Sequence, residues 1–201
     1  MKPEFLVFDN FYEFPDAIRD RALSLRYWHC DRHPTGGNWP GARTKYISDV
    51  APDIFVDFTS KIYNIFGWTA GKKVFFETNF QGCTKGDGDS WVHQDVMVQN
   101  HTHVGLIYLT PNPEKDSGTI LYEPKKDLDP EAFAKNNGDP CHYDIADVAE
   151  NVFNRCIIYS PDYWHKSNIY FGNNIDNCRL TQVFFFREEG AKTKFSKPLK
   201  L

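Results

Sequence analysis

The sequence predicts a mainly β protein with flanking helices, either a β-sandwich or a jelly-roll barrel, with N-terminal helices packed on one sheet. Aromatic residues make up 16% of the chain, with 17 Phe and 10 Tyr against only 2 Met, a balance typical of β-rich packing. Helical periodicity is confined to the first third of the chain, and after Gly71 short strand-like segments alternate with turn residues. Runs of helices followed by runs of strands favour a sheet with helices on one face.

The length of 201 residues fits one domain. We divide it into a helical N-terminal part (1–72), a jelly-roll core (73–187) and an insert within that core (125–153). The net charge of −4, without a basic run, gives no sign of nucleic-acid binding. No apolar stretch approaches about 18 residues and the start shows no signal-peptide pattern, so we expect neither a membrane span nor secretion. Five scattered cysteines without a Cys-x-x-Cys pair favour a reducing compartment, and we expect a cytoplasmic protein.

The N-terminal part is predicted to contain a strand, two helices and a long loop. Residues 4–8 are predicted as the strand. Apolar residues recur at helical spacing over 15–27 and again over 51–66, where Gly67 provides a C-terminal stop. Residues 28–44 hold two prolines and three glycines and are predicted as a loop.

The core is predicted to contain a series of short strands. They are expected near residues 73–81, 90–96, 102–110, 118–122, 155–160, 164–170 and 178–187. The insert over 125–153 is polar and interrupts this rhythm, so we expect short helices or a mobile flap there. Loops of this kind are where substrate specificity usually resides.

A His-x-Asp pair gives the strongest local indication of chemistry. Residues i and i+2 of a strand point to the same face, so His93 and Asp95 can direct an imidazole and a carboxylate at one metal ion. A third ligand is needed, and His165 is the candidate. Two histidines and one carboxylate leave coordination sites open for substrate and O₂, as in non-haem Fe(II) oxygenases. Each residue also has a simpler explanation, because His-x-Asp pairs occur by chance and His165 can be a core histidine bonded to the backbone.

Arg179 begins a hydrophobic, strand-like run and shares a face with Thr181. Burying an arginine is costly unless it meets an anion, and its planar fork suits a carboxylate. Together with a metal site, this pair predicts a pocket for the distal carboxylate of a dicarboxylate cosubstrate. The alternative is an ion pair between Arg179 and one of the protein's own acids.

Two further segments carry residues suited to binding. In the 28–44 loop, Trp39 and Arg43 can line the substrate entrance, with Arg43 binding an anion of the substrate; the alternative is a surface loop with Trp39 packed against the protein. His101 and His103 form a His-x-His pair, but no glutamate follows closely to complete a metal site of the cupin kind. We therefore expect these histidines to be solvated or to face a substrate.

Five motifs occur in order through the core. They are HQD at 93–95, HVGLIYLTP at 103–111, SGTILYEP at 117–124, YWHKS at 163–167 and RLT at 179–181. This order resembles the Fe(II)/2-oxoglutarate-dependent dioxygenase superfamily, most closely its prolyl-4-hydroxylase-like branch.

The resemblance implies a double-stranded β-helix with Fe(II) on three ligands, His93, Asp95 and His165. It implies 2-oxoglutarate held between the metal and the Arg179–Thr181 pair, with assistance from Tyr108. The implied reaction uses O₂, converts 2-oxoglutarate to succinate and CO₂, and hydroxylates a small-molecule or peptide substrate, with ascorbate as an optional reductant.

The chain also departs from the prolyl hydroxylase pattern. Those enzymes often have lysine where this chain has Arg179, and a Gly-Gly turn where it has Ser117-Gly118. A collagen or other peptide substrate therefore does not follow from the resemblance. Two other functions fit the same residues: a non-catalytic jelly-roll binding module, and a zinc-dependent hydrolase using the same ligands.

Overall fold

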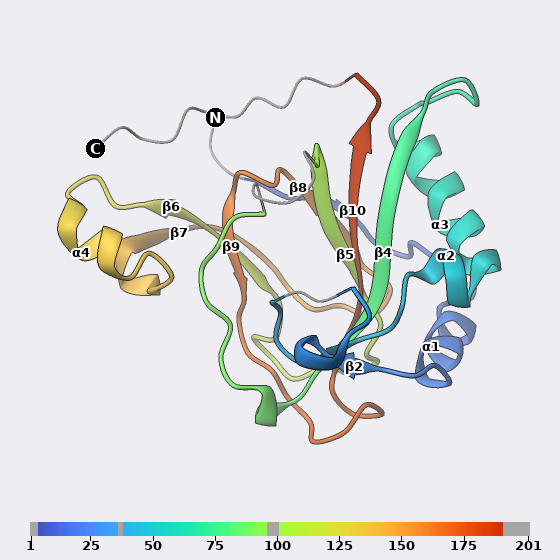
Figure 1. The fold of residues 1–201 in the computed structure, drawn as a ribbon, viewed down its shortest axis with the longest axis horizontal. Helices are drawn as coiled ribbons and strands as arrows, with labels where there is room; N and C mark the ends of the chain where they lie inside the picture. Colours follow the sequence, from blue (N-terminus) through green and yellow to red (C-terminus); the bar gives the residue numbers. More distant parts are fainter. Residues whose placement is uncertain (1–3, 36–37, 96–100, 191–201) are drawn as a thin grey trace.

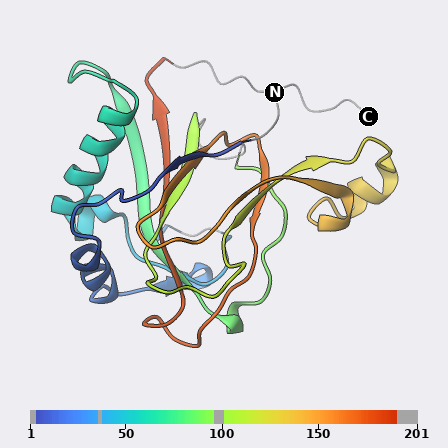
Figure 2. The ribbon, with the colours of Figure 1, turned by 180° about the vertical axis from the view of Figure 1, so that it is seen from behind.

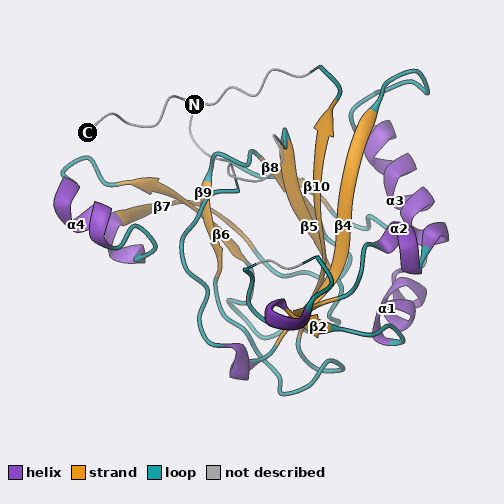
Figure 3. Ribbon diagram, viewed as in Figure 1, coloured by secondary structure: helices purple, strands orange, loops and turns teal. Residues whose placement is uncertain are grey.

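The computed structural model of the protein describes residues 4–35, 38–95 and 101–190. Two antiparallel sheets form its centre, and helices cover one side (Figures 1 and 3). The strands are β1 Leu6–Phe8, β2 Trp28–His29, β3 Ala42–Arg43, β4 Val74–Cys83, β5 His103–Tyr108, β6 Thr119–Pro124, β7 Tyr143–Ala149, β8 Cys156–Tyr159, β9 Trp164–Ser167 and β10 Arg179–Glu188. The α-helices are α1 Pro15–Leu23, α2 Ile47–Val50, α3 Pro52–Ile65 and α4 Pro130–Lys135, and the short 3₁₀ helices are Cys30–Arg32, Lys85–Asp87 and Pro140–His142.

The larger sheet has the strand order β1-β8-β5-β10-β4-β3-β2, and the smaller sheet has the order β7-β6-β9. At the centre of the larger sheet, β10 pairs along its whole length with β4 and over six residues with β5. Alternate side chains of these strands point to opposite faces. Phe184 and Phe186 of β10 therefore belong to one core cluster, and Val183 and Phe185 pack against another.

The outer face of the larger sheet is covered by the three N-terminal helices (Figures 1 and 2). Ile54, Phe58 and Ile62 recur along α3 at helical spacing and are buried against the sheet. The helix ends at Ile65, and two residues later Gly67 has a backbone φ of +63°, a conformation that glycine adopts without strain. The helices therefore cover one face of the larger sheet, and its other face forms the interior between the two sheets.

The interior between the sheets is lined by apolar and aromatic side chains. Leu106, Tyr108 and Tyr159 of the larger sheet cluster with Leu121 and Ala149 of the smaller one. This arrangement confirms the predicted mainly β, jelly-roll fold class. None of the described helices is both long and apolar enough to cross a membrane.

Several predicted boundaries in the N-terminal part were wrong. The helix predicted over 15–27 ends at Leu23, because the chain turns there to place Trp28 opposite Arg43 in the sheet. The segment predicted as a loop over 28–44 contributes the two short strands β2 and β3. Strands of two residues have no periodicity that a sequence pattern can reveal.

The predictions for the core were wrong at two places. Of the strand predicted over 90–96, the described residues show only an isolated bridge between His93 and His165. The 125–153 insert contains short helices, as expected, but also the missed strand β7, which pairs with β6 along a hairpin that carries α4 at its tip (Figure 1). Most side chains of β7 are partly or fully exposed, and its seven residues lie within an insert that is polar as a whole, which concealed the strand.

Candidate active site

The three predicted metal ligands converge in the structure, although His165 is 72 residues away from His93 along the chain. His165 lies on β9, and the backbone of His93 pairs with it through reciprocal N–H···O bonds of 3.0 and 2.9 Å. The backbone N–H of Asp95 donates to the carbonyl of Pro161 at 2.9 Å. The His-x-Asp segment therefore lies alongside β9, outside the smaller sheet, and its alternate side chains face His165.

Their ligand atoms are close enough to share one ion. The three atoms lie within 4.8 Å of one another. Nε2 of His165 is 3.2 Å from Oδ2 of Asp95, and Nε2 of His93 is 3.9 Å from Oδ1 of the same carboxylate. Among the described residues, this is the one such group of three or more histidine, cysteine or acidic side chains.

Hydrogen bonds on the far side of each imidazole orient it for ligation. Nδ1 of His93 lies 2.9 Å from the carbonyl of Trp91, and Nδ1 of His165 lies 3.0 Å from the carbonyl of Tyr163. A carbonyl accepts but cannot donate, so each Nδ1 carries a proton, and in a neutral imidazole the lone pair is then on Nε2. Two neutral imidazoles and a carboxylate are the donor set of the Fe(II) facial triad, and the residues fit such an ion.

The protonation states of these groups also suit a cation. Burial, reinforced by the nearby His165, lowers the pKa of His93 below its usual value. Burial alone would raise the pKa of Asp95, but His165, His93 and Arg43 more than offset this and lower it. At neutral pH the site therefore offers a carboxylate and an unprotonated imidazole at His93, both of which can bind a metal without first losing a proton.

Arg179 lies in the same interior, at the start of β10, and is only 3% exposed. Its Nε donates to the carbonyl of Ser117 at 2.8 Å, and one terminal amino group donates to the hydroxyl of Thr119 at 3.2 Å. Among the described residues, no carboxylate lies within 4.0 Å of this guanidinium, and its other terminal amino group has no acceptor. The alternative of an ion pair with the protein's own acids is therefore not seen.

Tyr108 lies against this guanidinium, and Thr181 shares the same face of β10. Thr181 lies opposite Tyr108 across the β5–β10 pair, and the guanidinium carbon of Arg179 is 5.3 Å from the centre of the Tyr108 ring. The Tyr108 hydroxyl bonds the hydroxyl of Thr119 at 2.8 Å, and burial raises its pKa, so it stays protonated. The result is a cluster of hydroxyl and guanidinium donors in an otherwise apolar interior, which suits a carboxylate.

Tyr159 connects the two groups of residues. Its ring lies 4.8 Å from that of His165, edge to face, and it belongs to the same apolar cluster as Tyr108. Burial raises the pKa of Tyr159 well above its usual value. The metal-ligand group and the arginine pocket therefore border one continuous interior.

Trp39 and Arg43 also come together. The guanidinium carbon of Arg43 lies 4.5 Å from the centre of the Trp39 ring, and its Nε donates to the Gln81 side chain at 3.0 Å. Because Arg43 pairs with Gln81 across the β3–β4 ladder, both side chains stand on the inner face of the larger sheet.

His101 and His103 were expected to be solvated or to face a substrate. This was wrong for His103, and His101 is buried and therefore not solvated. The His103 ring stacks on Phe186, 4.6 Å away, on the helix-covered face of the sheet. The His101 ring is buried against Phe185, whose side chain points to the opposite face. The two imidazoles therefore pack on different faces of the larger sheet. The reason is that β5 begins only at His103, so the residues before it do not follow the alternation of that strand.

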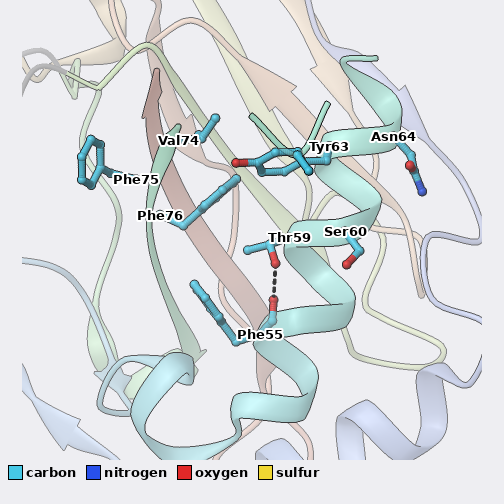
Figure 4. Close-up of a pocket in the computed structure, with 9 residues that line it drawn as sticks. Phe55, Thr59, Ser60, Tyr63, Asn64, Val74, Phe75 and Phe76 are labelled. Atoms are coloured by element: carbon cyan, nitrogen blue, oxygen red, sulfur yellow. Dashed lines mark hydrogen bonds between the residues drawn. The ribbon is translucent and has the colours of Figure 1, made fainter. Parts of the chain in front are cut away.

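A hollow on the outside of the molecule has no part in this site. It lies between α3 and the start of β4, and Figure 4 shows its lining side chains, among them Phe55, Tyr63 and the half-exposed Phe75. It shares no residue with the metal-ligand group or with the Arg179 pocket.

Three contributors to the site were missed in the sequence. Thr119 accepts from Arg179 and bonds Tyr108, Gln81 holds Arg43, and Tyr159 packs on His165. Thr119 lies in the SGTILYEP motif and was within reach of sequence reasoning, because a polar residue at the buried start of a strand needs a partner. Gln81 and Tyr159 carry no comparable signal.

The comparisons with known proteins agree with this architecture. No family profile and no curated protein matches the chain by sequence. Among solved structures, the chain is similar to HygX from Streptomyces hygroscopicus with nickel and 2-oxoglutarate bound, at a TM-score of 0.65 and 13% identity, covering 96% of this chain and 85% of that one. It is also similar to a Trichoplax adhaerens prolyl hydroxylase in complex with a hypoxia inducible factor peptide fragment (TM-score 0.59, 12% identity, 92% and 84% covered). A third similar structure is a Pseudomonas putida prolyl-4-hydroxylase (TM-score 0.55, 14% identity, 92% and 93% covered). At such identities the likeness establishes the fold, and the chain has the double-stranded β-helix that its motif order implied.

Proposed function

We propose that this protein is an Fe(II)- and 2-oxoglutarate-dependent oxygenase that hydroxylates a small-molecule or peptide substrate. The observation that carries the proposal is the convergence of His93, Asp95 and His165, with both imidazoles turned so that Nε2 faces the shared carboxylate. The fold shared with structures that hold 2-oxoglutarate and a metal supports it.

In this proposal the three ligands hold Fe(II) by one face. When bound, the ion supplies oxidative chemistry in which O₂ is consumed, 2-oxoglutarate becomes succinate and CO₂, and the substrate gains a hydroxyl group. The backbone pairing between His93 and His165 keeps the ligands in place, and the carbonyls of Trp91 and Tyr163 hold a proton on each Nδ1, so that Nε2 is the ligating atom.

Arg179 and Thr181 bind the distal carboxylate of 2-oxoglutarate, and Tyr108 positions them. The terminal amino group of Arg179 that has no acceptor among the described residues is the donor best placed for this carboxylate. The apolar side chains around the pocket keep water out, which strengthens the attraction between guanidinium and carboxylate. Trp39 and Arg43 lie on the substrate side of the site.

Turnover of 2-oxoglutarate tests the function. Purified protein supplied with Fe(II), ascorbate, O₂ and 2-oxoglutarate should form succinate at a slow rate even without its substrate. His93→Ala and Asp95→Ala should abolish both iron binding and succinate formation. His29→Ala, which removes an exposed histidine that lies 3.8 Å from Asp87, is the matched control and should retain both.

The same experiment separates the alternatives. A zinc hydrolase would bind zinc through the same ligands but would not bind 2-oxoglutarate. A non-catalytic binding module would retain no stoichiometric metal that depends on His93 and Asp95. Either result would overturn the oxygenase proposal.

A further inference from the structure

The region around Arg43 has more hydrogen-bond donors than acceptors. Nε of Arg43 is used by Gln81, but neither terminal amino group has an acceptor among the described residues. The indole N–H of Trp39, whose ring lies under the guanidinium, is buried without a partner in the described part of the chain. A buried donor without an acceptor is costly, so the Trp39 N–H indicates a missing acceptor, and it lies beside two amino groups of the half-buried Arg43 that can share that acceptor.

Arg43 also lacks a counter-ion. Among the residues that the structure describes, no carboxylate lies within 4.0 Å of its guanidinium. Burial lowers the pKa of Arg43 to about 10, so the group still carries its positive charge at neutral pH. A half-buried, charged guanidinium with no carboxylate beside it is the arrangement that an anionic ligand stabilises.

The geometry of the surrounding residues fixes Arg43 in this position. Gln81 accepts from Nε of Arg43 through its side-chain oxygen and donates through its nitrogen to the carbonyl of Pro40 at 2.8 Å. Trp39 covers one face of the guanidinium. The Nε–H and one face of the guanidinium are therefore occupied, and the two terminal amino groups are left to bind an acceptor.

Arg43 and Arg179 flank the same interior. Both guanidinium groups act electrostatically on the thiol of Cys83, and Arg43 also acts on the metal-ligand carboxylate of Asp95. In the proposed function, 2-oxoglutarate uses one carboxylate at the metal and the other at Arg179. Both acid groups of the cosubstrate are then accounted for, and Arg43 is left for an acid group on the second reactant.

We propose that Arg43, with Trp39 and Gln81, forms the subsite that receives a carboxylate of the prime substrate, so that the substrate class is organic acids. This inference rests on the proposed function and refines it. The planar fork matches a carboxylate, which can accept from both terminal amino groups at once.

Acetate is the probe for this subsite, with protein loaded with zinc, which is diamagnetic, and saturated with 2-oxoglutarate. In ¹⁵N-labelled protein, the Nε–H signal of Arg43 and the indole N–H signal of Trp39 are followed during titration at constant ionic strength. Arg43→Lys identifies the first signal and Trp39→Phe identifies the second, so each assignment stands without the other. The Nε–H signal of Arg19, which bonds backbone carbonyls beside α1, is the internal control.

Both site signals should shift saturably with acetate, in the millimolar range expected for one charge-assisted contact, and not with the neutral acetamide. The Arg19 signal should not move. In Arg43→Lys, half-saturation of the Trp39 signal should require about tenfold more acetate, because the fork is lost. Saturation by phosphate at lower concentration than by acetate would replace the carboxylate with a phosphate class and overturn the assignment.

Two other results would also overturn it. If acetate up to roughly 0.1 M moves neither signal, the subsite does not bind a carboxylate. If 2-oxoglutarate itself saturates the Arg43 signal and acetate then has no effect, Arg43 serves the cosubstrate. Failure of the proposed function is separate, because it would appear as absence of 2-oxoglutarate binding, whatever the response to acetate.

Discussion

Replacing Arg179 with methionine is expected to weaken 2-oxoglutarate binding by roughly 100- to 1000-fold. One terminal amino group of Arg179, which carries two N–H donors, has no acceptor among the described residues and can give two charge-assisted bonds to the cosubstrate. Each such bond contributes about 1.5–3 kcal/mol, so losing both near the lower end costs about 3–4 kcal/mol. Arg179→Lys keeps the charge but not the fork, and we expect a smaller loss of about tenfold.

Calorimetric titration of the manganese-loaded protein with 2-oxoglutarate measures this effect. Arg179→Met also leaves the carbonyl of Ser117 without its donor, so the variant should be less stable and must be titrated well below its melting temperature. The matched control is Arg19→Met, which also removes an arginine that donates to two backbone carbonyls but lies outside the site. If folded Arg179→Met binds 2-oxoglutarate within about threefold of the unchanged protein, the assignment of this pocket is wrong.

Three further outcomes follow from the structure. Gly118→Ala would place a Cβ 2.1 Å from the carbonyl oxygen of Ala149, so we expect the free energy of unfolding to fall by about 2–4 kcal/mol and Tm to fall by roughly 5–15 °C. Gly71→Ala is the control, because its Cβ would meet no heavy atom within 4 Å and Tm should stay nearly unchanged. Burial lowers the pKa of His103 below its unfolded value of 6.5, so the folded protein loses stability as the pH falls through 6.5 towards that lower pKa. Between pH 7.5 and 5.5, urea unfolding should show a smaller loss of unfolding free energy for His103→Phe than for the unchanged protein, and an equal loss would contradict this account. Phe133→Ala removes a ring that packs against Tyr143 and Trp164, and we expect metal affinity to fall several-fold because Trp164 precedes His165, while exposed Lys135→Ala serves as the control in the same metal titration.

Much of the fold and the central group of the site could be read from local patterns. The two-residue spacing of His93 and Asp95 correctly indicated that both face one site, although the segment forms only an isolated bridge, and helical spacing along 51–66 correctly indicated the helix that covers the sheet. Such patterns act over a few residues, and they survive folding because burial selects the same faces. His165 was named as the candidate for the third ligand, and the structure brings it to the other two.

The environment of Arg179 could not be predicted in the same way. Its acceptors are the main-chain carbonyls of Ser117 and Gly118 and the hydroxyl of Thr119, and backbone carbonyls leave no trace in a sequence. A glycine is needed at 118 because any side chain would meet the carbonyl of Ala149. The strands β2 and β3 were missed for a related reason, because the pairing of β3 with the edge of β4 and of β2 with β3, not an intrinsic pattern, makes them strands.

The position of the insert changes how the site should be understood. It was expected to be short helices or a flap, but the N–H of Val92, one residue before His93, donates to the carbonyl of Gly138 within the insert. Val92 also lies in one apolar cluster with Tyr143 of the insert and with Tyr122 of β6. The segment that carries two of the three metal ligands is thus held by β9 on one side and by the insert on the other. Because a metal site tolerates little misplacement of its ligands, this packing gives the insert a structural part in the site that does not depend on its moving.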